Sequence, residues 1–308
     1  MDKLKFAAVS RNYFNMPIWV AKHAGHFDAE GLDVDIELYE PIDEVTERLR
    51  DGRVQFAFGV TEHVILDNEA GGHMRIIGGN VNKLPFSFIA GKNIRSIADL
   101  RGKTVGVSSI EAGSSSLVMK LLSAHGLEYP RDYEIRAVGP ILARWELLQS
   151  GDIDAGLQGV PLNFIALDQG YPTLCEPRSE FPHFQFTSLH VDGRWAETNP
   201  DIMRRFMRAF VRAHQWFFDN RAEATRIAVK ESGIPEAYAL RAWDEYTREE
   251  IFPRDGNLAT EAVQTLIDIS SLIRAIPNRR KTQADDYIDR SYLFAAQREL
   301  KQTAGVTA

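Results

Sequence analysis

The chain of 308 residues has a single cysteine, no long apolar run and no block of like charge. With only Cys175, an internal disulfide and any site built from several cysteines are excluded. No window approaches the roughly 20 apolar residues of a membrane span, so we expect no transmembrane role. The net charge of −7 argues against nucleic acid or anionic membrane as a partner and favours a small molecule.

The first residues also lack a targeting pattern. Residues 1–9, MDKLKFAAV, are too short and too polar for a signal peptide. We therefore expect a cytoplasmic protein, or a periplasmic one if the native N-terminus was trimmed. A hydrophobic content of 44% is enough for a large core and suggests about two domains.

Short β-branched or apolar runs alternate with helical patterns along the first two thirds of the chain. This order predicts an α/β fold of two mostly parallel sheets flanked by helices, with the ligand beyond the carboxyl ends of the strands. The expected strands and extended runs are 6–9, 34–38, 54–58, 74–78, 86–90, 104–107, 134–138, 152–157 and 184–191. We interpret 86–90 and 184–191 as crossings between two lobes. Lobe 1 would hold residues 1–87 and 189–308, and lobe 2 residues 88–188.

The last third of the chain has a helical pattern from Asn199 onward, with Pro200 as the first helical residue. Further helices are expected near 221–232, 235–251, 260–276 and 283–300. Four arginines between 204 and 212 lie opposite an apolar stripe, and we interpret them as a solvated face. His214 lies on the stripe itself, which favours a packed, hydrogen-bonded histidine.

Residues 101–122, RGKTVGVSSIEAGSSSLVMKLL, predict a buried strand, a glycine and serine turn, and an apolar helix. The first N–H groups of a helix have no intrahelical partner and favour negative charge. Together with three serine hydroxyls they could hold a carboxylate, sulfonate or phosphate. Alternatively, Ser114 or Ser115 merely caps the helix. No lysine follows the glycine and no G-x-G-x-x-G is present, which disfavours a nucleotide.

Three segments carry a resemblance to a known family. Residues 17–32 (PIWVAKHAGHFDAEGL), 96–107 (SIADLRGKTVGV) and 151–155 (GDIDA) resemble the substrate-binding proteins of ABC importers. The resemblance is to the branch that binds sulfonates, taurine, nitrate and pyrimidine precursors of thiamine. It covers roughly residues 4–220 and implies a two-lobed clamp of the type II periplasmic-binding-protein fold. It also implies an ABC permease as a partner.

The same fold hosts enzymes, and the resemblance bears on two of them. An aromatic sulfinate desulfinase has a nucleophilic cysteine after the first strand, where this chain has Tyr13. The thiamine pyrimidine synthase has a cysteine cluster that this chain lacks. Family members that serve importers are exported, and no export signal is recognised here. Cys175 is expected to be a bystander.

The candidate ligand-binding positions come from the turns at strand ends and from the resemblance. They are Tyr13, Phe14, Asn15, Thr61, Glu62, His63, Asn80, Ser108, Gly113, Ser114, Ser115, Ser116, Arg144, Trp145, Gln158, Pro161 and Asn163. The aromatic side chains would stack on a flat ligand, and Arg144 would bind a carboxylate or sulfonate or else lie on the surface.

Two functions remain open from the sequence. The first is a binding protein that closes on a small anion or aromatic acid. The second is an enzyme on the same fold, a lyase or hydrolase, in which His63 beside Glu62 moves a proton. No cofactor is expected. His23 and His26 are too poorly placed around Gly25 to bind a metal without a third ligand.

Overall fold

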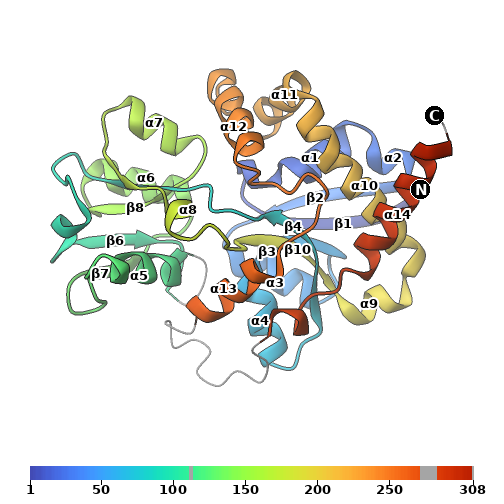
Figure 1. Ribbon diagram of the computed structural model, residues 1–308, viewed down its shortest axis with the longest axis horizontal. Coiled ribbons are helices and arrows are strands. Elements are labelled where there is room, and N and C mark those ends of the chain that lie inside the picture. Colours follow the sequence, from blue (N-terminus) through green and yellow to red (C-terminus); the bar gives the residue numbers. More distant parts are fainter. Residues whose placement is uncertain (111–113, 271–282, 307–308) are drawn as a thin grey trace.

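The computed structural model describes residues 1–110, 114–270 and 283–306 and consists of two five-stranded sheets with helices on both faces (Figure 1). Sheet 1 has the order β2-β1-β3-β10-β4 and sheet 2 the order β7-β6-β8-β5-β9. We call the units around these sheets lobe 1 and lobe 2. The strands of sheet 1 are β1 (Asp2–Val9), β2 (Leu32–Tyr39), β3 (Phe56–Val60), β4 (Met74–Val81) and β10 (Thr187–Asp192). Those of sheet 2 are β5 (Ser87–Ala90), β6 (Thr104–Val107), β7 (Glu134–Ala137), β8 (Ala155–Gln158) and β9 (Thr173–Cys175).

Both sheets are mixed, because the chain crosses between them twice. In sheet 1, β1 runs parallel to β2 and β3, whereas β10 is antiparallel to β3 and β4. In sheet 2, β6 runs parallel to β7 and β8, whereas β5 is antiparallel to β8. Residues 82–86 and 181–186 are the two crossings, and β5 and β10 follow them. The carboxyl ends of the parallel strands in each sheet therefore share an edge with the starts of β5 or β10.

Lobe 1 is covered mainly by helices that pack apolar faces on sheet 1. The helices of this lobe are α1 (Met16–His23), α2 (His26–Ala29), α3 (Ile42–Arg50), α4 (Thr61–Glu69), α9 (Gly193–Thr198), α10 (Pro200–Asp219), α11 (Arg221–Ser232), α12 (Glu236–Arg248), α13 (Thr260–Ser270) and α14 (Ser291–Val306). The stripe predicted on α10 is buried, and Phe206 stacks on Phe56 of β3 at 3.7 Å between ring centroids. Lobe 2 has α5 (Ser114–Ala124), α6 (Ile141–Ser150), α7 (Leu162–Asp168) and α8 (Pro177–Glu180).

The arginines of α10 were expected to form a solvated face, but two of them form ion pairs with a buried glutamate. Arg208 and Arg212 both pair with Glu30, which is 8% exposed, and Arg208 Nη1 also lies 2.6 Å from Glu299 Oε2. These ion pairs tie α10 to α14 and to the end of α2. His214 is fully buried as expected, and burial lowers its pKa to about 3.

The helix expected over 283–300 begins only at Ser291. Ile76 of β4 donates to the Tyr287 carbonyl oxygen at 2.9 Å, and Asp289 donates back to Ile76 at 2.8 Å. Residues 287–289 are thus held as an extended segment beside β4, and only a short 3-10 helix, η3 (Ala284–Asp286), precedes them. The helix expected over 260–276 is confirmed for Thr260–Ser270, and its last part lies outside the described residues.

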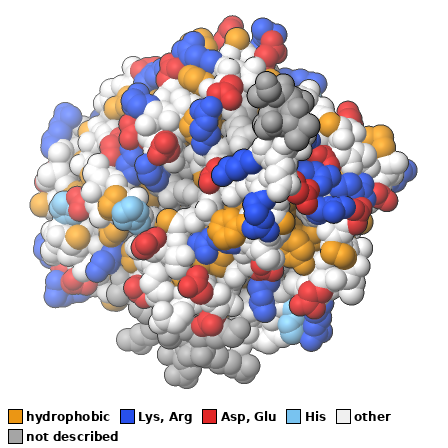
Figure 2. All heavy atoms as spheres, turned by 45° about the vertical axis from the view of Figure 1, so that its right-hand side comes forward, with side chains coloured by type: hydrophobic (Ala, Val, Ile, Leu, Met, Phe, Trp, Pro, Cys, Tyr) orange, Lys and Arg blue, Asp and Glu red, His pale blue; other side chains and the backbone are white. Residues whose placement is uncertain are grey.

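The distribution of charge on the surface and the polarity of the helices agree with what the amino-acid composition predicts. Side chains of both signs are interspersed over the face shown in Figure 2, which carries no field of one sign. Within the described ranges, no helix is both long and apolar enough to cross a bilayer, and no cluster of three or more metal-ligating side chains occurs.

Candidate functional site

The two lobes meet at a cluster of three phenylalanines, which we call the aromatic floor. Phe14 follows β1, Phe86 ends the first crossing and Phe186 ends the second. Their ring centroids lie 4.9–5.8 Å apart in edge-to-face pairs. A side chain on Gly159, the residue after β8, would lie within 3.8 Å of the Phe14 ring. The strand ends of both sheets therefore approach each other over this floor, as the parallel-strand rule predicts.

The strand ends of lobe 1 present polar side chains that hydrogen-bond to one another. Thr61 begins α4 directly after β3, and its Oγ1 lies 2.9 Å from Ser188 Oγ. Ser188 Oγ lies 2.8 Å from His190 Nε2. Burial lowers the pKa of His190 to about 3, so its ring is neutral. This chain of buried groups fixes the orientation of the Thr61 hydroxyl.

Two predicted asparagines complete the lobe 1 side. Asn15 donates from Nδ2 to the Ser10 carbonyl oxygen at 2.7 Å and ties its turn to the end of β1. Asn80, near the end of β4, donates from Nδ2 to Thr187 Oγ1 at 3.0 Å. Among the described residues its buried Oδ1 has no hydrogen-bond partner. A buried acceptor without a partner is costly, so Asn80 Oδ1 is a candidate contact for a ligand N–H.

His63 points toward α3, away from a partnership with Glu62. Its Nδ1 lies 2.6 Å from Thr46 Oγ1, and its Nε2 lies 3.4 Å from Asp43 Oδ1. Burial lowers the pKa of His63 to about 4. Glu62, in the same helical turn, is 1% exposed. Both nitrogens of His63 are thus used inside lobe 1, which disfavours the proton-transfer role considered from the sequence.

The serine turn of lobe 2 divides its hydroxyls between two tasks. Ser114 and Ser108 hold each other: Ser108 N donates to Ser114 Oγ at 2.9 Å, and Ser114 N to Ser108 Oγ at 3.3 Å. Ser115 Oγ donates to the Ile110 carbonyl oxygen at 2.8 Å. Ser116 is fully buried, and its Oγ has no partner in the described part of the chain. Gly113 lies outside the described residues. Ser116 is therefore the hydroxyl of this turn that is available to a ligand.

The last residue of β8 and the turn after it supply further side-chain atoms that lack hydrogen-bond partners among the described residues. Gln158 is fully buried, and neither of its amide atoms has a hydrogen-bond partner among the described residues. Asn163, in the first turn of α7, also has a buried Oδ1 without a partner, and Pro161 precedes that helix at its N-cap. Gln158 offers a donor and an acceptor side by side, which suits a ligand with the complementary pair.

Arg144 is buried inside lobe 2 and is not a surface residue. Its stem crosses Gly106 and Gly156, where an added Cβ would lie 3.2 and 2.6 Å from the arginine. Its guanidinium donates to the carbonyl oxygens of Leu157 and Gly139. Burial lowers its pKa to about 10. Among the described residues its Nε has no hydrogen-bond partner, and no carboxylate forms an ion pair with it.

Two aromatic residues expected to stack on a ligand pack on protein instead. The Tyr13 ring is 1% exposed and is enclosed by Tyr246, Phe252 and Phe217 of lobe 1. Trp145 packs edge-on against Tyr171 at 4.9 Å between centroids. Their spacing after strand ends was compatible with a cleft, but each ring points into the core of its own lobe. Phe14, in the aromatic floor, stays a predicted stacking partner for a ligand.

Sequence reasoning missed groups on the antiparallel strands. Ser188 and Thr187 begin β10, and Ser87 begins β5 opposite Gln158. Ser87 Oγ donates to Glu176 Oε1 at 2.8 Å, and burial raises the pKa of Glu176. The signal was present: polar residues interrupt both apolar crossing runs at the point where a strand starts.

A second set of interlobe contacts joins α7 to α12. Phe164 stacks on Tyr238 at 6.3 Å between centroids, and Arg241 lies over the Phe164 ring at 4.3 Å. Asp168 accepts from Tyr238 Oη at 3.0 Å and from Arg241 Nη1 at 3.1 Å. The C-terminal helical region thus takes part in holding the lobes together.

Comparison with known proteins places this architecture. The family model described as "NMT1/THI5 like" matches residues 12–224. The chain belongs to the NMT1/THI5-like family. One curated relative is the 4-amino-5-hydroxymethyl-2-methylpyrimidine phosphate synthase of Schizosaccharomyces pombe. It is 29% identical to this chain, and the match covers 64% of this chain and 60% of the relative. The synthase THI13 of Saccharomyces cerevisiae is 24% identical over 65% of this chain and 62% of its own length. The match thus spans about three fifths of each relative.

Solved structures share the fold at low identity. The alkanesulfonate-binding protein SsuA from Xanthomonas axonopodis, bound to MOPS, superimposes with a TM-score of 0.75, 18% identity, and coverage of 94% of this chain and 99% of that one. A mutant of DSZB in complex with biphenyl-2-sulfinic acid gives a TM-score of 0.72 at 17% identity, covering 97% of this chain and 99% of that one. The two-lobed type II periplasmic-binding-protein fold expected from the sequence is confirmed. The residue boundaries of the two lobes stay a prediction.

Proposed function

We propose that this protein binds one small organic molecule between its lobes and closes on it, in the manner of ABC-importer substrate-binding proteins. An ABC permease would be the partner that receives the ligand. The proposal rests on one observation: in the described part of the chain, buried polar atoms without hydrogen-bond partners occur at the strand ends of both sheets and in the first turns of the helices that follow them. Asn80 Oδ1 belongs to lobe 1, and the amide of Gln158, Asn163 Oδ1 and Ser116 Oγ belong to lobe 2. Native proteins rarely leave such groups unpaired.

The chemistry of these groups indicates the ligand class. Gln158 requires a donor and an acceptor on the ligand, while Ser116 and Arg144, which pairs with no carboxylate among the described residues, favour an anionic or strongly electronegative group. The aromatic floor suits a flat ring. We therefore propose a flat ring with polar edges or an organic sulfonate or carboxylate. The names of the relatives support this range, since they include an alkanesulfonate-binding protein and pyrimidine phosphate synthases.

A ligand panel tests the proposal. Thermal unfolding would be measured with alkanesulfonates, aromatic carboxylates and aminopyrimidines, followed by calorimetric titration of those that raise the melting temperature. We expect one class to bind the wild type at one site and to lose at least tenfold in affinity in Gln158→Leu. X-ray scattering of the complex should show compaction. A panel compound that binds Gln158→Leu as well as the wild type, or leaves the scattering profile unchanged, would argue against the interlobe site.

A second candidate is an enzyme on the same fold, which the synthase names of the curated relatives favour. Glu176 is a better proton-transfer group for it than His63, because burial raises the pKa of Glu176 and Ser87 places it beside Gln158. Cys175 is a poor nucleophile, since burial raises its pKa to about 12. Mass spectrometry of panel compounds after incubation would decide: a product formed by the wild type and absent with Glu176→Gln would favour the enzyme.

A further inference from the structure

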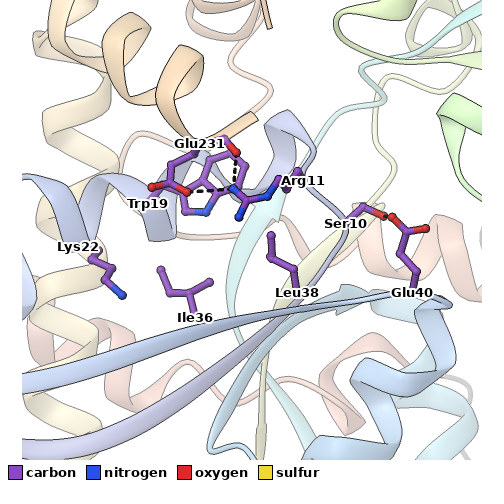
Figure 3. Close-up of a pocket in the computed structure, with 8 residues that line it drawn as sticks. All are labelled: Ser10, Arg11, Trp19, Lys22, Ile36, Leu38, Glu40 and Glu231. Carbon is purple, nitrogen blue, oxygen red and sulfur yellow. Dashed lines mark hydrogen bonds and ion pairs between the residues drawn. The ribbon is translucent and has the colours of Figure 1, made fainter. Parts of the chain in front are cut away.

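A cavity lies in lobe 1, on the outer side of the loop that follows β1. It has a volume of about 490 Å³ and lies between α1, strand β2 and the end of α11 (Figure 3). None of the predicted interlobe ligand residues lines it. Its volume falls within the range of small-molecule sites in proteins.

One wall of this cavity is apolar. Ile36 and Leu38 are two residues apart on β2, so their side chains lie on the same face, and Figure 3 shows both rising from the strand toward the cavity. Trp19 of α1, which is 2% exposed, lies across from them. β2 is an edge strand of sheet 1. These three side chains form a surface on which an apolar body can pack.

Some of the charged side chains that line the cavity form hydrogen bonds or ion pairs, and others do not. Glu231 lies 2.5 Å from His23 Nε2 and 3.4 Å from Arg11 Nη1, and Glu40 accepts from Ser10 Oγ at 2.5 Å. Each acidic side chain thus has at least one hydrogen-bond or ion-pair partner. By contrast, within the described residues no hydrogen bond or ion pair involves Trp19 Nε1 or Lys22 Nζ. Two donors of the cavity therefore have no partner among the described residues.

We propose that this cavity is a second binding site, which takes an organic monoanion with an apolar body, such as an aliphatic or aromatic monocarboxylate. The apolar body packs on Ile36, Leu38 and the Trp19 ring. The carboxylate accepts from the Trp19 indole N–H and pairs with Lys22.

The backbone beside the cavity supports a functional role. Ser10 lies at φ 50°, a left-handed conformation that is uncommon for a residue with a side chain. Such strain concentrates at binding sites and is held by the surrounding structure. Here the Ser10 carbonyl oxygen is fixed by Asn15 and its hydroxyl by Glu40. The strained residue forms one end of the cavity.

Tryptophan indole signals in NMR provide a direct test with the full chain. The protein would be labelled with ¹⁵N-tryptophan, and the Trp19 signal assigned from its loss in Trp19→Phe. Sodium octanoate is the probe, and sodium sulfate tests for an effect of ions alone. We expect octanoate to move the Trp19 signal with saturation, and sulfate to leave it in place. Lys22→Glu should weaken octanoate at least tenfold, whereas Lys120→Glu, an exposed lysine of lobe 2, should titrate like the wild type.

Three results would overturn the proposal. These are a Trp19 signal that octanoate does not move, a change confined to other indole signals, and an unchanged affinity in Lys22→Glu. The remaining indole signals check that each variant is folded. Because Gln158→Leu removes the proposed interlobe contact without touching this cavity, octanoate should still move the Trp19 signal in that variant. A loss of the effect there would assign octanoate to the interlobe cleft and would also overturn the second site.

Discussion

The two sides of the cleft use their buried polar groups differently. On the lobe 1 side, Thr61, Ser188 and His190 satisfy one another within 3 Å. On the lobe 2 side, Gln158 and Ser116 are equally buried and have no partner among the described residues. The first arrangement stabilises the protein without a ligand. The second costs free energy until a ligand supplies the missing hydrogen bonds.

This difference separates stability from recognition. Substitutions of Thr61, Ser188 or His190 on the lobe 1 side should mainly change the free energy of unfolding, because each of these side chains is bonded to another group of the protein. Substitutions on the lobe 2 side should mainly change the free energy of binding. The predictions below test this division, beginning with the largest expected effect.

Acid should destabilise the ligand-free protein through its buried histidines. Burial lowers the pKa of His63 to about 4 and those of His190 and His214 to about 3. Below pH about 6.5 the unfolded chain binds protons that the native protein does not, so stability is complete above that pH and falls as the pH drops toward 4. Each histidine should cost about 1.4 kcal/mol per pH unit in this window.

Urea unfolding at pH 7, 6 and 5 measures this loss. The His63→Gln variant should have a flatter dependence of the unfolding free energy on pH than the wild type. Equal unfolding midpoints at pH 7 and 5 would mean that the buried histidines are not held neutral.

Two fully buried glutamines offer a matched pair for the next test. Gln158 makes no hydrogen bond among the described residues, whereas Gln185 Nε2 donates to Asn82 Oδ1 and to the Thr187 carbonyl oxygen, both at 2.8 Å. Gln158→Leu should weaken ligand binding about 10- to 100-fold while the melting temperature of the free protein stays the same or rises.

Gln185→Leu should do the opposite, lowering stability by about 1–3 kcal/mol with a smaller effect on affinity. Calorimetric titration measures the ligand affinity of each variant, and thermal unfolding measures its stability. If Gln158→Leu is the less stable of the two and binds normally, the division between the two sides is wrong.

Two serines of the serine turn should show the same separation of binding from stability, with smaller effects. Ser116→Ala should weaken binding about tenfold and leave the free protein's stability unchanged, since its hydroxyl bonds to no described residue. Ser114→Ala removes its bonds to Ser108 and should cost about 1 kcal/mol of stability. Parallel melting and titration experiments compare them. Identical profiles for the two variants would show that the turn acts as one structural unit.

The smallest effect is expected for the single thiol. Cys175 lies on the outermost strand of sheet 2, and burial raises its pKa to about 12. Cys175→Ser should therefore change ligand affinity and any turnover by less than about threefold, or under roughly 1 kcal/mol. A complete loss of turnover in this variant would identify it as a nucleophile.

The sequence was sufficient for the fold because its periodicities are local. The alternation of strand and helix patterns identified most elements to within a few residues, and the resemblance indicated two lobes. The error at residues 283–290 arose because the main-chain bonds between Tyr287 and Ile76 join residues about 200 positions apart. No local pattern encodes such a contact.

The sequence predicted where the candidate site lies better than it predicted what each side chain does there. The strand-end turns gave Thr61, Ser116 and Gln158, because the carboxyl ends of parallel strands meet at one edge. Tyr13 and Trp145 were misinterpreted since spacing along a loop does not fix the direction of a side chain. Ser188 was missed because it lies on an antiparallel strand, which brings its first residue to the site instead of its last.

The helix α12 adds a kinetic consequence. Its residues Tyr238, Arg241 and Glu245 are spaced so that they share one face, and this face contacts Asp168 and Arg178 of lobe 2. The lobes are thus joined at the crossings and again at α12, so that separating them must break ion pairs that lie outside the cleft. The Asp168–Arg241 pair is partly exposed to solvent and is screened by salt. Ligand dissociation should therefore become faster at higher ionic strength even when the ligand itself carries no charge.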